Sequence, residues 1–278
     1  IPMIELPEAV TLARQINETL RGKRIAEAVR GNTPHKFAFY NHTPEEYAAI
    51  LPGKVVGAAR HHGNNILVDL DPGYVQVLGG GGERILYHTD AKTLPKKHQY
   101  LWRFEDNAYL TVSVQMWGSL HLLRPEELTD HPHLGPVRIS PLDEGFTRDY
   151  FLGLFDELEE NDARAIKYFI ISKPGVWGVG NGYLHDILYL AKLHPRRRAV
   201  DVTASERVAL YDALMSVIRR ATELGGRDDE HDLFNRVGGY RRVLDSSMAG
   251  QPCPTCGVAI EKIQFLGGAS YFCPHCQI

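Results

Sequence analysis

The chain has 278 residues, of which 44% are hydrophobic and 23% charged, and a formal net charge of −3. It is long enough for two domains and a small appendage, and its hydrophobic content excludes global disorder. Residues 1–8 lack a signal-peptide pattern, and no apolar run approaches the roughly 18 residues of a membrane span, so we expect a cytoplasmic protein without membrane contact.

The spacing of hydrophobic residues changes along the chain from a helical pattern to a pattern of short strands. Residues 7–20 show helical spacing and are followed by Gly22, which predicts an N-terminal helix. From residue 25 to residue 123 the pattern becomes one of short strands between polar turns, typical of an antiparallel β-sandwich or barrel. The predicted strands are 55–56, 65–70, 74–78, 83–87, 100–104, 109–114 and 118–123.

The second half of the chain shows helical periodicity, after a proline-rich and charged stretch at 125–145 that is predicted to be a linker. The predicted helices are 149–159, 163–171, 182–191 and 204–224. Basic clusters at 192–198 and 236–242 favour a nucleic-acid partner, but clusters of charge are as common on solvated surfaces. Charge alone therefore leaves both interpretations open.

The chain's four cysteines all lie within its last 26 residues: Cys253, Cys256, Cys273 and Cys276. Each Cys-x-x-Cys turn brings two thiolates to one metal ion, and strands predicted over 258–263 and 269–272 bring the two turns together. Four thiolates complete the tetrahedral coordination of zinc, so we expect one structural Zn²⁺. Two disulfides or a redox centre are the alternatives, and they fit poorly in an otherwise cysteine-free chain expected in the cytoplasm.

This order of elements, together with three motifs, resembles the formamidopyrimidine-DNA glycosylase and endonuclease VIII family. Glu5-Leu6-Pro7-Glu8 is similar to the family's opening Pro-Glu-Leu-Pro-Glu, and the segment 177–183 resembles the Gly-x-Gly-Asn turn of its helix–two-turn–helix. The cysteine segment is similar to the family's zinc finger. The resemblance covers essentially the whole chain.

The resemblance implies an α+β fold in four parts. These are an N-terminal helix plus antiparallel β-sandwich domain at 1–124, the linker at 125–145, a helical domain with a helix–two-turn–helix at 146–245, and a zinc-finger hairpin at 246–278.

The resemblance also implies a function in base excision repair. Family members bend DNA, extrude a damaged base, and attack the sugar C1′ with an N-terminal proline amine that forms a Schiff base. They are DNA N-glycosylases with AP lyase activity, and Glu5 and Glu8 match carboxylates of their catalytic group. The implied nucleic-acid-binding residues are Lys167, Gly180 and Asn181 in the helical domain and His61, His62, Gln115 and Trp117 in the β-domain.

Each of these binding residues has a plainer interpretation. The glycines around Gly180 let the backbone turn tightly and approach a phosphate, but the same pattern occurs in ordinary turns between helices. Trp117 stands where the family inserts an Arg-Phe wedge into the helix. His61 and His62 can act as bases or phosphate contacts, or they are simply exposed loop histidines.

The sequence departs from the family at several catalytic positions. Ile4 stands where the family has its proline, Asn64 where it has the β-domain lysine, and Gly268 where it has the zinc-finger arginine. Since removing one such group costs roughly 10²–10⁴ in rate, losing several is expected nearly to abolish the family's usual reaction.

Three functions follow from this mixture. The first is an active DNA glycosylase that uses Glu5 with another nucleophile or with activated water. The second is a non-catalytic protein that recognises damaged or structured nucleic acid. The third, more distant, is a protein that serves an RNA or protein partner. We expect a monomer whose partner is damaged or abasic duplex DNA, with RNA as an alternative.

Overall fold

The computed structural model describes residues 3–131, 134 and 138–278. The chain divides into two compact units. The N-terminal unit comprises 1–138 together with 224–239, and the C-terminal unit comprises 139–223 and 240–278. The predicted linker lies partly outside the described residues, and the bounds of the four predicted parts stay predictions. Among the residues described, no helix is long and apolar enough to cross a membrane.

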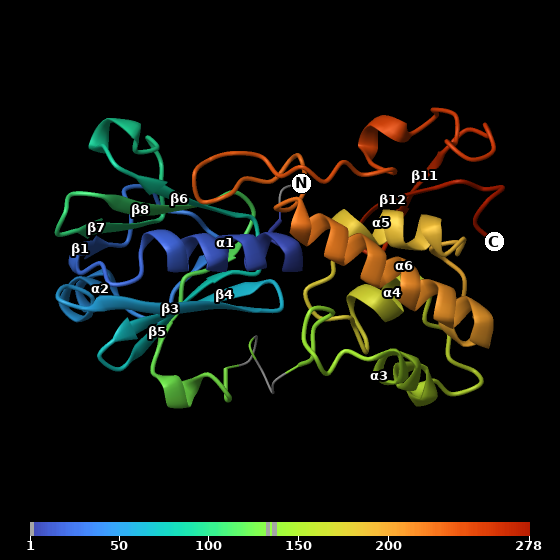
Figure 1. The fold of residues 1–278 in the computed structure, drawn as a ribbon, viewed down its shortest axis with the longest axis horizontal. Helices are drawn as coiled ribbons and strands as arrows, with labels where there is room; N and C mark the ends of the chain where they lie inside the picture. The colour runs from blue at the N-terminus through green and yellow to red at the C-terminus, as the bar shows by residue number, and fades with distance from the viewer. Residues whose placement is uncertain (1–2, 132–133, 135–137) are drawn as a thin grey trace. The chain divides into compact units, whose positions relative to one another are not determined.

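The N-terminal unit begins with α1 (Leu6–Thr19), close to the predicted helix. Proline in the first turn and the backbone N–H of Glu5, which donates to the Glu8 carboxylate at 3.1 Å, fix where this helix starts. Its apolar face, which includes Leu12 and Ile16, is buried in the core of the unit. The helix packs on strands β3 (Val55–His62) and β4 (Asn65–Asp71), beside which it lies in Figure 1.

Two four-stranded antiparallel sheets form most of the rest of this unit. One has the order β1-β7-β8-β6, with bounds Ile25–Val29, Tyr100–Phe104, Tyr109–Val114 and Glu83–His88. The other has the order β10-β5-β4-β3, where β10 is Leu122–Leu123 and β5 is Tyr74–Gly79. Side chains of both sheets and of α1 share one core, which confirms the predicted sandwich.

Several features of this unit differ from the strand prediction, and β3 extends to His62 where only 55–56 was predicted. The predicted strand 118–123 is two short strands, because β9 (Gly118–Ser119) pairs in parallel with β2 (Ala38–Phe39) while β10 pairs with β5. The strand β1 and the helix α2 (Pro44–Ile50) were not predicted. Both are short, so neither supplies enough residues for a clear periodicity.

The C-terminal unit is helical and ends in a strand hairpin (Figure 1). Its helices are α3 (Arg148–Gly153), α4 (Ile166–Ile171), α5 (Asn181–Leu190) and α6 (Ala204–Glu223). The hairpin strands are β11 (Glu261–Phe265) and β12 (Gly268–Phe272). The strand β11 starts three residues later than predicted, since residues around Ala259 pair with the backbone of the first cysteine turn.

The buried side chain of Asp186 on α5 connects the helices to the hairpin. Its carboxylate accepts hydrogen bonds from the Tyr240 hydroxyl at 2.9 Å and from the backbone N–H groups of Val243 and Leu244. This anchors the segment that enters the zinc finger. Burial raises the pKa of Asp186, and these donors oppose that effect.

Candidate nucleic-acid interface and metal centre

Arg227 is the centre of a buried cluster of charged groups at the start of α1. Its guanidinium lies 3.0 Å from the Glu5 carboxylate and 3.1 Å from that of Glu230, and its backbone N–H donates to Glu8 at 3.0 Å. Arg227, Glu5 and Glu8 are each 2–3% exposed. Buried charges persist only when they are paired, so this cluster fixes both carboxylates that the resemblance assigns to the catalytic group.

Glycine allows the Arg227 segment to approach α1 closely. Gly226 has φ +97, and a Cβ there would lie 2.9 Å from the Glu8 carboxylate. Farther along, the Gln15 amide donates to Asp232 at 2.9 Å and accepts from the backbone of Leu233 at 2.9 Å. The segment 224–239 is thus attached to the helix at two places, Arg227 and 232–233. Sequence reasoning missed Arg227, for which the only local signal is the Gly-Gly pair before it.

The backbone nitrogen of Ile4 occupies the position that the resemblance assigns to the amine. It donates to the carbonyl of Gly81 at 2.9 Å, and Ile4 is 2% exposed. Gly81 belongs to a run of four glycines at 79–82, here called the glycine loop. The side-chain amide of Asn64 donates to Gly80 O at 3.2 Å and therefore also braces this loop. Because the nitrogen of Ile4 is a hydrogen-bonded amide, it cannot form a Schiff base.

Glu83 holds the glycine loop in place from its other side. Its carboxylate accepts hydrogen bonds from the backbone N–H groups of Gly81 and Ser119, each at 2.9 Å. Burial raises the pKa of Glu83 to about 7. The loop has no room for a side chain, since a Cβ on Gly81 would lie 2.2 Å from the Trp117 carbonyl.

The raised pKa of Glu83 predicts a pH dependence of stability. Between the ordinary value of 4.5 and about 7 the folded state binds a proton that the unfolded state has lost. We therefore expect the free energy of unfolding to fall as pH rises through this window and to level off above it. Urea unfolding at pH 5, 6, 7 and 8 measures this. In the Glu83→Gln variant, whose side chain does not titrate, the free energy of unfolding is expected to fall less steeply with pH over this window. Parallel curves for the two proteins would contradict the assignment.

The β-domain residues implied to bind nucleic acid lie at two places. Gln115 and Trp117 share the exposed loop between β8 and β9, and Trp117 is 39% exposed. His61 and His62 are half-buried at the end of β3, not fully exposed, and His62 Nε2 lies 3.2 Å from the carbonyl of Leu134. Their roles stay predictions.

Three segments meet beside the start of α5. Gly180 is the N-cap of that helix and Asn181 its first residue. Lys167 on α4 is fully buried, and its ammonium donates to Phe265 O at 2.8 Å and to Ser270 Oγ at 2.9 Å. Burial lowers the pKa of Lys167 to about 8. The ammonium thus joins α4 to the hairpin turn, and the predicted phosphate contact stays a prediction.

The hairpin turn also comes close to Asn181. A Cβ on Gly268 would lie 3.4 Å from the Asn181 side-chain nitrogen. Gly268 is the position at which the resemblance would place the zinc-finger arginine. The turn therefore lies beside the helix terminus, but it presents no side chain of its own at that position.

The four cysteine sulfur atoms form a metal site. They all lie within 4.8 Å of one another, with Cys253 and Cys276 at 3.9 Å and Cys256 and Cys273 at 3.5 Å. A tetrahedron with Zn–S bonds of about 2.3 Å needs sulfur separations of about 3.8 Å, whereas a disulfide needs about 2.05 Å. The predicted single structural zinc is confirmed, and the disulfide alternative is wrong.

Neighbouring groups orient the zinc ligands. The Tyr189 hydroxyl lies 3.2 Å from Cys253 Sγ, and the backbone N–H of Cys276 donates to Cys273 Sγ at 3.3 Å. The side chain of Gln277 accepts from the Cys273 N–H at 2.8 Å and donates to Leu193 O at 2.9 Å. Such contacts hold thiolates in place for a metal. His275 is exposed, as expected for a residue that is not a ligand.

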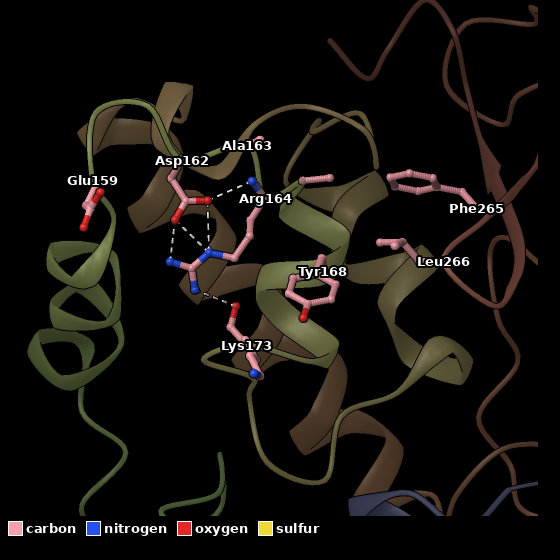
Figure 2. A pocket seen from close by; sticks show the side chains of 9 residues that line it. Glu159, Asp162, Ala163, Arg164, Tyr168, Lys173, Phe265 and Leu266 are labelled. Carbon is pink, nitrogen blue, oxygen red and sulfur yellow. Dashed lines mark hydrogen bonds and ion pairs between the residues drawn. The ribbon is translucent and has the colours of Figure 1, made fainter.

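The C-terminal unit also carries an open surface depression, shown in Figure 2. It is lined by Glu159, Asp162, Ala163, Arg164, Ala165, Tyr168, Lys173, Phe265 and Leu266. The Arg164 guanidinium points toward the Asp162 carboxylate and donates to it at 2.5–3.0 Å, so the two charges offset each other. Among its described lining residues the depression has none of the predicted site residues.

Comparisons with known proteins cover the whole chain. The family model of the formamidopyrimidine-DNA glycosylase N-terminal domain matches residues 3–145. The model of the formamidopyrimidine-DNA glycosylase H2TH domain matches 137–231, and that of a zinc finger found in FPG and IleRS matches 250–278.

Individual relatives match over similar lengths. A formamidopyrimidine-DNA glycosylase of Bacillus licheniformis is 30% identical over 99% of both chains, and one of Streptococcus pneumoniae is 29% identical over 99% of both. Among solved structures, Lactococcus lactis Fpg in complex with DNA containing an abasic site matches with a TM-score of 0.85 at 22% identity, over 99% of each chain.

Proposed function

Because the chain belongs to the formamidopyrimidine-DNA glycosylase family, we propose that it binds damaged duplex DNA and hydrolyses the bond between a damaged base and its sugar. The chain is a zinc-containing homologue of these repair glycosylases. Relatives named for formamidopyrimidine suggest an oxidised, ring-opened purine as the first substrate to test. The solved relative bound to abasic-site DNA supports duplex DNA as the partner.

One observation supports hydrolysis over Schiff-base chemistry. The nitrogen of Ile4 is an amide that donates to Gly81 O, while the neighbouring Glu5 carboxylate is held by Arg227. In the proposed reaction Glu5 takes a proton from water, the water oxygen bonds to C1′, and the base leaves with the bonding electrons and takes up a proton. Glu8 positions this carboxylate by capping α1 and holding the Arg227 backbone.

The remaining predicted residues enter the proposal as DNA contacts. Gly180 and Asn181 offer the N-terminus of α5 to a phosphate, with Lys167 close to the same turn. Trp117 is proposed to enter the space left by the extruded base, with Gln115 beside it. His61 and His62 are proposed as further phosphate contacts. We further propose a cytoplasmic monomer that binds DNA in preference to RNA.

The experiment follows two products with one substrate. A labelled duplex carrying a formamidopyrimidine lesion is incubated with the protein, and released base and strand cleavage are measured separately. We expect base release without a borohydride-trapped adduct on abasic-site DNA. Glu5→Gln is expected to slow release by about 10²-fold or more, because it removes the proton acceptor.

Glu230→Gln is the matched control, since it also removes one carboxylate from Arg227. It is expected to bind and release as the unaltered protein does. A trapped adduct would overturn hydrolysis in favour of a Schiff base. Tight binding without base release would instead identify the non-catalytic recognition protein. In that case the logarithm of the binding constant should fall with the logarithm of the salt concentration, with a slope of about −0.9 per phosphate contacted.

A further inference from the structure

The N-terminal unit presents four large apolar side chains on two neighbouring segments. Phe37 and Phe39 are each 47% exposed, Met116 is 38% exposed and Trp117 is 39% exposed. Phe39 belongs to β2, which starts directly after Phe37, and β9 starts directly after Trp117; the two strands pair in parallel with Ala38 opposite Gly118. We call these four side chains the aromatic ledge.

The backbone geometry places the members of the ledge together. Phe39 lies in β2 and Phe37 in the turn directly before it, so the two rings are carried two residues apart by the segment that pairs with β9. The N–H of Gly118 donates to Phe37 O at 2.9 Å, which brings the loop carrying Met116 and Trp117 next to this segment.

The ledge is held firmly although it is exposed. The N–H of Leu120 donates to Phe39 O at 2.9 Å. The Gln99 side chain donates to Thr33 O at 2.9 Å and accepts from the N–H of Val114 at 2.7 Å, which ties together the chains leading into both halves of the ledge. A fixed surface of this kind loses little conformational entropy when it binds a flat partner.

Positive charge borders the ledge. The ammonium of Lys36 lies 5.3 Å from the centre of the Phe37 ring. Lys97 is exposed, and its carbonyl accepts from Ser113 Oγ at 3.0 Å, three residues before Met116. Aromatic faces bordered by lysines suit a chain of flat bases joined by phosphates.

We propose that the aromatic ledge stacks unpaired bases, so that the protein binds single-stranded or locally opened DNA more tightly than intact duplex. A single wedge residue fills the place of one extruded base, whereas four side chains on a fixed surface offer faces for more than one base. In an intact duplex the base faces are already stacked and cannot reach the ledge. The inference rests on the proposed function and adds a preferred substrate class to it.

The test compares one labelled 12-residue strand of mixed sequence, alone and annealed to its complement, at fixed salt. We expect the strand alone to bind the unaltered protein more tightly. Phe37→Thr combined with Phe39→Thr is expected to weaken single-strand binding about tenfold or more, while duplex binding changes less than twofold. Leu190→Thr, which removes a 50%-exposed side chain elsewhere, is the control and should change neither.

Every outcome decides the matter. Equal single-strand binding by the double variant, or tighter binding of the duplex by the unaltered protein, overturns the proposal. A self-association that disappears in the double variant also overturns it and assigns the ledge to a second copy of the chain. If the double variant does not fold, Phe37→Thr alone replaces it. Failure of the base-release assay with single-strand preference intact would refute the proposed function and not the ledge.

Discussion

Removing zinc with a chelator, or replacing Cys273 by serine, will unfold the β11–β12 hairpin. Binding of a structural zinc ion contributes about 10–16 kcal/mol to the folding of small zinc domains. The apolar cluster around the finger is small, with Leu244, Ile260 and Tyr271 among its members, and a two-stranded hairpin is barely stable alone. Zinc content by atomic absorption and amide hydrogen exchange over 250–278 measure the loss.

His275→Ser is the control for the zinc prediction, because His275 is exposed and lies between two ligands without being one. It should retain one zinc per chain and full protection of the hairpin. A hairpin that stays protected after the zinc has been removed would contradict the structural role. Loss of the hairpin would also expose the Lys167 ammonium to water and relieve the burial that lowers its pKa, so this pKa should rise from about 8 toward the ordinary value of 10.5.

Arg227→Met will destabilise the N-terminal unit by about 3–5 kcal/mol, the usual cost of leaving a buried charge without its partner. The substitution keeps most of the side-chain volume but leaves Glu5, Glu8 and Glu230 buried beside an apolar group. Burial already raises the pKa of Glu230. Because the folded variant will take up a proton on Glu230, which has lost its guanidinium partner, we expect its deficit to shrink as pH falls from 7 toward 5. Urea unfolding at both pH values measures this.

Arg236→Met is the matched control for the arginine prediction. Its side chain is 67% exposed and pairs with Asp232 at 3.0 Å. Because the arginine of this pair is exposed, although Asp232 is only 11% exposed, we expect the pair to contribute about 0–1 kcal/mol. Similar losses for the two variants would mean that the buried cluster does not stabilise the unit through its charges.

Local patterns in the sequence predicted much of the fold. The helix over 7–20 could be predicted because its apolar residues recur at helical spacing, and the strands over 65–70 and 74–78 because each is a short apolar run bounded by turn residues. The zinc site follows from the spacing of two cysteine pairs, whose geometry is local. By contrast β2 has two residues and exists only because β9 lies beside it, so no pattern inside Ala38–Phe39 could have indicated it.

The candidate site likewise contains residues that a local motif predicts and residues that only distant contacts reveal. Glu5 and Glu8 came from a motif of consecutive residues, but Arg227 lies 219 residues beyond Glu8 and has no pattern that links the two. Lys167 was predicted because it matches a position at which the resembling family contacts phosphates. Its burial could not be predicted, because it depends on Ser270, 103 residues away. Contacts over such separations are set by tertiary packing, which the periodicity of a single sequence does not describe.

The return of 224–239 to the N-terminal unit has a consequence for synthesis on the ribosome. Residues 1–138 leave the ribosome first, but the guanidinium of Arg227, which pairs with Glu5 in the folded unit, is made only much later. The whole helical stretch up to α6 is translated in between. The first part of the chain must therefore wait, incompletely folded, and its maturation is timed by translation of the second part.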